Sequence, residues 1–241
     1  PIVQELANEY LAEQGITILN NVTLNSVSND GNKPVITANN QNYTFDAVLY
    51  ATGRRPNTTN IGLENTDITT NERGSIIVND TCESSVPGVY AVGDVNGGPQ
   101  FTYISLDDFR IVFGALTGNG NYTLKDRKNI PYTTFLTPPL ARVGLTEQEA
   151  SNKGYTVKTK ELLVATMPRA HVNDNLKGAF KIVVDAKNNL ILGATLYAQS
   201  AEELINLIKM AMDNNIPYTY FKNQIFTHPT MAENLNDLCN F

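Results

Sequence analysis

The chain has no tryptophan, and only two histidines and two cysteines occur among its 241 residues. Cys82 and Cys239 form neither a Cys-x2-Cys nor a Cys-x4-Cys pair, and the histidines lie far from them, so no structural zinc site is predicted. Unpaired cysteines are more typical of a reducing compartment than of a disulfide-stapled secreted domain, which predicts a cytoplasmic protein. No apolar run approaches the roughly 20 residues that a membrane helix needs, so we expect no membrane partner.

Positive charge in excess and phosphate-binding turns are also absent from the sequence. The formal net charge of −6 argues against nucleic acid or an anionic membrane surface as a partner. The only glycine clusters are Gly97-Gly98 and Gly118-Asn119-Gly120. Neither has the Gly-x-Gly-x-x-Gly spacing after a strand that places a dinucleotide pyrophosphate at a helix N-terminus. An apolar content of 41% over this length is enough for one or two hydrophobic cores.

The first half of the chain reads as one amphipathic helix followed by short strands. Apolar spacing predicts the helix over residues 1–16, and Gly15 is a usual stop signal for its C-terminus. Turn-rich segments separate the strand candidates of this half. They are residues 17–19, 22–27, 35–38, 43–45, 47–50, 75–78 and 89–92. A second helix is predicted over residues 105–116.

From about residue 126 the pattern changes to an α+β unit. Five segments have the composition of an antiparallel sheet, namely residues 132–135, 142–144, 156–163, 179–185 and 190–196. Thr146 and Glu149 have the spacing of a capping box at the start of a short helix. Residues 201–214 form an amphipathic helix with an apolar stripe. The predicted fold class is therefore α+β, with an antiparallel sheet and flanking helices at the C-terminal end.

The C-terminus places His228 directly before Pro229 and Glu233 five residues after the histidine. Proline suits the first position of a helix, so we expect His228 on an incoming strand and Glu233 in the helix's first turn. A carboxylate that holds an imidazole can tune a general acid/base near neutral pH. The alternative is a buried structural histidine beside a glutamate that the helix dipole favours.

Three ordered motifs give the chain a resemblance to a known family. They are Ala51-Thr52-Gly53-Arg54-Arg55-Pro56-Asn57, the stretch from Val86 through Gly93-Asp94 to Val95, and His-Pro-Thr-x-x-Glu from His228. In this order they resemble the pyridine nucleotide–disulfide oxidoreductases, which include glutathione reductase, dihydrolipoamide dehydrogenase and mercuric reductase. Residues 100–110, 137–144 and 224–229 resemble most the reactive-chlorine-resistance branch, which implies a role in oxidative stress.

The resemblance implies a domain organisation and a reaction. Residues 1–55 would be the end of an NAD(P)-binding domain, 56–125 part of an FAD-binding domain, and 126–241 a dimerisation domain. Complete members are nearly twice as long and contain a redox-active disulfide, so the chain resembles the C-terminal half of a homodimeric flavoenzyme. Such an enzyme uses FAD and NAD(P)H to reduce a small oxidant, a metal ion or a disulfide. The alternative for the isolated chain is a non-catalytic dimerisation module.

The resemblance also implies flavin and nucleotide contacts. Gly93 would let the backbone turn after a strand and leave Asp94 to bond the ribityl hydroxyls of FAD; the alternative is an Asx turn that closes the strand. Thr102 would bring its backbone amide to the pyrimidine edge of the flavin, with a helix dipole behind it, unless it is an ordinary helix start. Gly53 would permit close approach of the dinucleotide, or else it lies in a plain domain-junction turn.

For the C-terminal pair, the resemblance implies that His228 exchanges a proton with the redox disulfide of the opposite subunit while Glu233 orients the imidazole. The carbonyl of His228 would also meet the edge of the flavin ring. Cys239 stands alone in a hydrophobic tail and is predicted to be a passive thiol.

Overall fold

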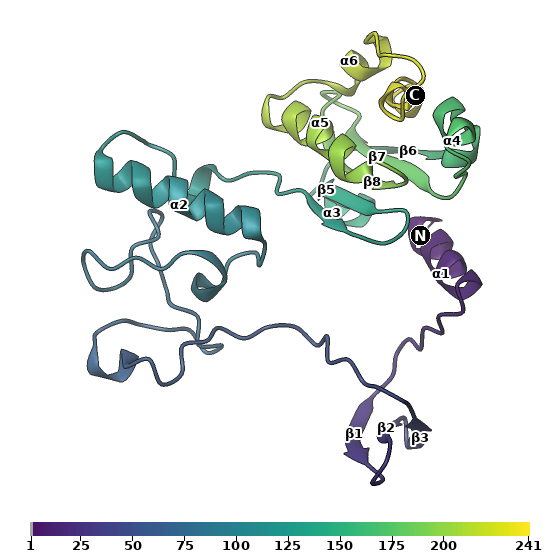
Figure 1. The fold of residues 1–241 in the computed structure, drawn as a ribbon. Coiled ribbons are helices and arrows are strands. Elements are labelled where there is room, and N and C mark those ends of the chain that lie inside the picture. The colour runs from purple at the N-terminus through teal and green to yellow at the C-terminus, as the bar shows by residue number, and fades with distance from the viewer. Residues whose placement is uncertain (1) are drawn as a thin grey trace. The chain divides into compact units, whose positions relative to one another are not determined.

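A computed structural model describes residues 2–241, which divide into two compact units (Figure 1). The first unit combines the residues up to Asn20 with Lys128–Phe241, and the second is Asn21–Arg127. Among the described residues, no helix has both the length and the apolar character needed to cross a bilayer. The three domains expected from the resemblance stay a prediction.

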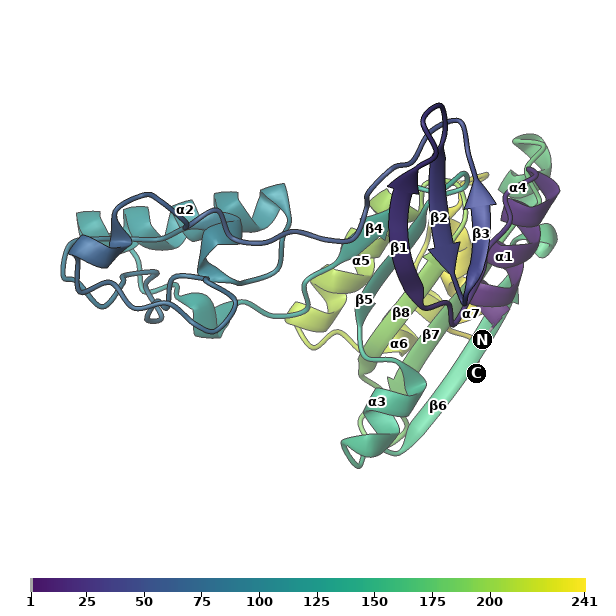
Figure 2. The ribbon, with the colours of Figure 1, turned by 90° about the horizontal axis from the view of Figure 1, so that it is seen from below.

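The first unit is built on a five-stranded antiparallel sheet (Figure 2). Its strands, in spatial order, are β4 (Tyr132–Thr134), β5 (Leu140–Gly144), β8 (Ile191–Tyr197), β7 (Ala179–Asp185) and β6 (Val157–Leu163). Every neighbouring pair is antiparallel. The sheet predicted from the sequence is thereby confirmed, and with it the α+β fold class.

Both faces of this sheet are covered. Phe180, Ile182 and Val184 alternate along β7 and belong to the main core, as the period of two in a strand requires. Four helices contribute to that core, namely α4 (Pro168–Val172), α5 (Ala201–Asp213), α6 (Tyr218–Asn223) and α7 (Leu235–Leu238). The N-terminal helix α1 (Ile2–Glu13) packs against Ala179 and Tyr197 in a separate cluster.

Local signals set several helix boundaries in this unit. The side chain of Thr146 accepts the N–H of Glu149 at 3.1 Å, and the Glu149 carboxylate accepts the N–H of Thr146 at 2.7 Å. This is the predicted capping box, and α3 (Glu147–Asn152) begins directly after it. Helix α1 ends before Gly15, which adopts a φ of 78°. Two short 3-10 turns complete the unit, η4 (Val164–Thr166) and η5 (Ala232–Asn234).

The second unit contains a three-stranded antiparallel meander and one long helix. The strands are β1 (Leu24–Asn29), β2 (Pro34–Ala38) and β3 (Gln41–Thr44), and the helix is α2 (Thr102–Thr117). The left-handed Gly118 ends α2. Short 3-10 turns occur at η1 (Leu63–Asn65), η2 (Gly93–Asn96) and η3 (Leu124–Asp126).

Four predicted strands are wrong. Residues 17–19 and 47–50 are irregular, and residues 75–78 and 89–92 make only isolated bridges, Thr70 with Ile76 and Glu83 with Tyr90. Strand-like composition stabilises a strand only when a neighbouring strand supplies a packed, hydrogen-bonded partner. Within the described residues these segments have no such partner, and Leu49 is 89% exposed.

Candidate functional site

The C-terminal pair is formed as its spacing predicts. Nδ1 of His228 lies 2.8 Å from Oε2 of Glu233. The imidazole is 67% exposed, whereas the glutamate side chain is only 19% exposed. The ring therefore lies at the surface, and the carboxylate that binds it lies mostly below the surface. The hydrogen bond from His228 lowers the pKa of Glu233 below its ordinary value, and the N–H of Thr230 lowers it further. Glu233 is therefore an ionised acceptor that holds the ring from one side.

The predicted helix start at Pro229 is wrong. Helical structure begins at Ala232, and His228 lies in an irregular segment and not on a strand. Glu233 accepts the N–H of Thr230 at 2.9 Å and donates its own N–H to the Thr230 hydroxyl at 3.2 Å. These reciprocal bonds have the pattern of a capping box, which places the start of the turn after Thr230. The Thr-x-x-Glu spacing was present in the sequence as the signal for it.

This arrangement leaves one ring nitrogen available. With Nδ1 directed at the carboxylate, Nε2 has no hydrogen-bond partner within residues 2–241. A carboxylate on one nitrogen fixes the tautomer and orientation of an imidazole, so the other nitrogen can take up and return a proton. The exposed ring contradicts the alternative of a buried structural histidine.

The second unit contains the predicted flavin residues at one turn and one helix start. Gly93 begins the 3-10 turn η2 with a φ of 73°. A Cβ atom at this position would lie 2.6 Å from Oγ of Ser105 on α2, so both the backbone angle and the packing require glycine. The turn thus lies against the first turns of α2, the helix that starts at Thr102.

Asp94 projects from this turn with its side chain 38% exposed. Its carboxylate accepts a hydrogen bond from Nη1 of Arg54 at 3.0 Å. Among the described residues this carboxylate accepts no hydrogen bond from a neighbouring backbone N–H, so the Asx-turn alternative does not apply. Gly53 has a φ of 103° and open space around it, in an irregular segment and not at the end of a strand as predicted.

Two functional candidates escaped the sequence analysis. Asp108 is fully buried on α2, and Arg127 forms an ion pair with it. The signal was the spacing of Ile104, Asp108 and Ile111, which puts the aspartate on the buried face of the helix. An aspartate on an apolar face needs partners, and the sequence did not say which.

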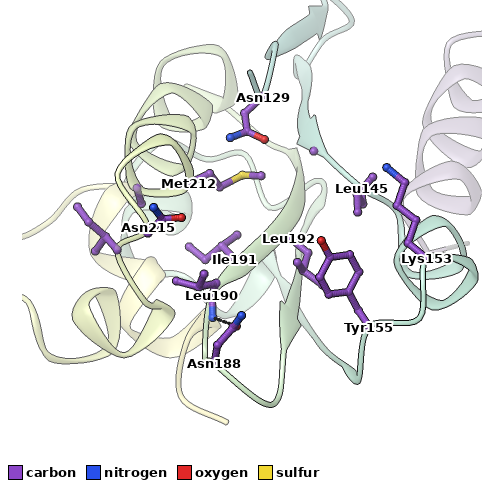
Figure 3. A pocket seen from close by; sticks show the side chains of 13 residues that line it. Asn129, Leu145, Lys153, Tyr155, Asn188, Leu190, Ile191, Leu192, Met212 and Asn215 are labelled. Atoms are coloured by element: carbon purple, nitrogen blue, oxygen red, sulfur yellow. Dashed lines mark hydrogen bonds between the residues drawn. The ribbon is translucent and has the colours of Figure 1, made fainter. Parts of the chain in front are cut away.

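A cavity of about 340 Å³ in the first unit lies apart from these residues (Figure 3). Leu145, Ile191 and Met212 give it apolar walls, and Asn188 and Lys153 are among its polar lining residues. None of the predicted site residues lines it. Within residues 2–241, no cluster of histidine, cysteine or acidic side chains could hold a metal ion.

Comparison with protein families gives two adjacent matches. The model of the pyridine nucleotide-disulphide oxidoreductases matches residues 1–108, and the model of their dimerisation domain matches residues 130–239. A probable pyridine nucleotide-disulfide oxidoreductase of Escherichia coli K12, RclA, is 44% identical over 95% of this chain and 52% of its own length. The mercuric reductase of Staphylococcus aureus is 35% identical over 98% of this chain and 44% of its own length. The chain spans about half the length of these relatives.

Solved structures agree with these matches. The HOCl-induced flavoprotein disulfide reductase RclA from Escherichia coli superposes with a TM-score of 0.95 at 41% identity, over 99% of this chain and 55% of that one. LpdA from Mycobacterium tuberculosis gives a TM-score of 0.88 at 23% identity, over 98% of this chain and 51% of that one, which supports the fold alone.

Proposed function

The chain belongs to the pyridine nucleotide-disulphide oxidoreductase family, and on this premise we propose that it forms the C-terminal part of a flavin-dependent NAD(P)H oxidoreductase. In the complete enzyme, electrons would pass from NAD(P)H through FAD and an active-site disulfide to the substrate. The acceptor would be a small oxidant, a metal ion or a disulfide, as the names of the HOCl-induced reductase and the mercuric reductases suggest. A reducing cytoplasm suits such a reaction.

Gly93, Asp94 and Thr102 are the residues proposed to hold the flavin. Their fit rests on the left-handed Gly93, whose missing Cβ allows the turn to lie against α2, and on the exposed carboxylate of Asp94. Asp94 would accept hydrogen bonds from the ribityl hydroxyls, and the positive end of α2 would favour negative charge near Thr102. A bound flavin would supply the two-electron centre between nucleotide and disulfide. Gly53 is proposed to allow close approach of the nucleotide.

The C-terminal pair is proposed to manage the proton that accompanies this electron transfer. Nε2 of His228 would accept the proton of a thiol on the partner subunit and return it, while Glu233 keeps Nδ1 protonated and the ring in place. The backbone carbonyl of His228 would contact the flavin edge. Because the thiols would come from a second subunit, a two-fold homodimer through the family's dimerisation domain is part of the proposal.

The observation that carries the proposal is the 2.8 Å contact between Glu233 and an imidazole that is 67% exposed. To test it, residues 1–241 would replace the matching segment of Escherichia coli RclA. The rate at which the purified chimera oxidises NAD(P)H in the presence of an electron acceptor would then be measured. We expect His228→Gln to lower kcat by about 10²- to 10⁴-fold, the usual contribution of general acid/base catalysis. Thr227→Ser, in the same segment, serves as the matched control. Unchanged turnover in the His228 variant would refute the proposed role.

The chain by itself allows a simpler experiment. After incubation with FAD and removal of free flavin, its visible absorption spectrum reports whether the flavin site is retained. A yellow protein that loses its flavin on substitution of Asp94 by alanine would support the proposed site. A colourless dimer in light scattering would favour the alternative, a non-catalytic dimerisation module, which the match of residues 130–239 to the dimerisation domain makes a specific candidate.

A further inference from the structure

A buried carboxylate lies beneath the turn that carries Asp94. Asp108, on α2, is fully buried and accepts the N–H of Gly93 at 2.7 Å through Oδ2. The same oxygen accepts a hydrogen bond from the side-chain amide of Asn96 at 2.9 Å. Gly93 and Asn96 are the first and last residues of η2, so one carboxylate oxygen binds both ends of the turn.

The charge of Asp108 is compensated by one arginine. Nη2 of Arg127 donates to Oδ1 of Asp108, and Nε of Arg127 donates to Asp107 at 2.7 Å. The arginine side chain is only 10% exposed. Hydrogen bonds between a guanidinium and a carboxylate are stronger than those between neutral groups. Arg127 therefore holds the Asp108 carboxylate in the position from which it accepts the Gly93 amide.

We propose that Asp108 is a positioning residue for the predicted flavin site. Gly93 is fixed from two sides, by the hydrogen bond to Asp108 and by its close packing on Ser105. The next residue, Asp94, then points its carboxylate outward from a turn that cannot rotate freely. The two carboxylates thus have different roles. The buried Asp108 holds the backbone of the turn, and the exposed Asp94 contacts the ligand. This inference rests on the proposed flavin-binding function.

Asp107 provides a matched control on the same helix. It pairs with the same arginine at 2.7 Å but has no hydrogen bond to any residue of η2 among the described residues. Asp108→Asn and Asp107→Asn therefore each replace one charged partner of Arg127 with a neutral amide. Only Asp108→Asn changes the group that accepts the Gly93 N–H. Should Asp108→Asn fail to fold, the double variant Asp108→Asn with Arg127→Gln takes its place in the comparison, because it also removes the guanidinium that has lost one of its two carboxylate partners.

The experiment compares these variants of the full chain by amide hydrogen exchange and by titration with FAD. We expect Asp108→Asn to speed exchange of the Gly93 amide and to weaken FAD binding, each about tenfold, the difference between a charged and a neutral acceptor. Asp107→Asn should change both by less than about threefold. Equal effects of the two variants, or faster exchange spread evenly over residues 21–127, would overturn the proposal.

A wild-type chain that binds no FAD would count against the proposed flavin function and not against the positioning of the turn. Exchange at Gly93 still decides the positioning in that case. Selective acceleration at Gly93 in Asp108→Asn supports it, and its absence refutes it.

Discussion

Replacement of Gly93 by alanine tests whether the turn before Asp94 requires glycine for its backbone angle, for its packing or for both. Gly93 has a φ of 73°, in the left-handed region. An added Cβ would lie 2.6 Å from Oγ and 3.3 Å from Cβ of Ser105. Two separate penalties are therefore expected, and the chain offers a control that carries only one of them.

Gly88 is that control, because it has a similar φ of 79° in the same unit but no atom within 4 Å of an added Cβ. Alanine in the left-handed region costs about 1–2 kcal/mol, which is the whole expected effect of Gly88→Ala. The crowding against Ser105 adds about 1–3 kcal/mol in Gly93→Ala. Adding Ser105→Ala removes the Oγ atom and should recover part of this second contribution, while the Cβ contact remains.

The assay is urea unfolding followed by peptide-resolved hydrogen exchange, so that residues 21–127 are measured apart from the other unit. We expect Gly93→Ala to destabilise this unit more than Gly88→Ala does, and Gly93→Ala with Ser105→Ala to lie between them. Destabilisation by Gly93→Ala no greater than by Gly88→Ala would refute the packing argument. A double variant no more stable than Gly93→Ala would show that Ser105 is not the obstacle.

Three further predictions concern the other unit and the thiols. The contact with His228 lowers the pKa of Glu233, so the contribution of this contact to stability is complete above the ordinary pKa of 4.5 and is lost as the pH falls through the folded-state pKa. Glu233→Gln should therefore make the urea midpoint fall less steeply below pH 4.5. A midpoint that falls as steeply as in the wild-type chain would contradict this. Burial raises the pKa of Cys82 to about 11 and of Cys239 to about 12. Neither thiol should react with iodoacetamide at pH 8 until urea is added. Rapid labelling of Cys239 in the native chain, detected by mass spectrometry, would refute the prediction that it is a passive thiol, and rapid labelling of Cys82 would contradict its burial. Thr146→Ala should destabilise the first unit by about 1 kcal/mol through loss of the capping box, with faster exchange confined to α3; Ser151→Ala, near the end of that helix, is the control.

Sequence patterns predicted those elements whose partners are also in the chain. Strands β7 and β8 follow each other along the chain and pair from Ala179 with Tyr197, with one register shift between Val183 and Val184. Both strands are rich in apolar residues, most of them buried. The capping box at α3 needs only four consecutive residues. In both cases the information is local or nearly so, and the sequence is enough to predict the element.

Residues 47–50 and 89–92 show where the same reasoning fails. Their composition favours strands, yet Leu49 is 89% and Val92 is 43% exposed. Strand-like composition shows that a segment would fit into a packed sheet. It does not show whether a neighbouring strand is present to pair with that segment. The order of the motifs still predicts Gly93 and Asp94 as site residues, because the family pattern does not depend on the strand before them being formed.

The residues of the candidate sites divide along the same line. His228 and Glu233 are five residues apart, so their contact was readable from the sequence, and only the start of the helical turn was misplaced. Asp108 lies 15 residues from Gly93 and 19 from Arg127, and no local rule links the three. The burial of Asp108 follows from helical spacing. Which donors reach its carboxylate depends on how the rest of the unit folds around the helix. The sequence therefore reveals a pair of polar residues that are close along the chain more readily than a buried group whose partners are far along it.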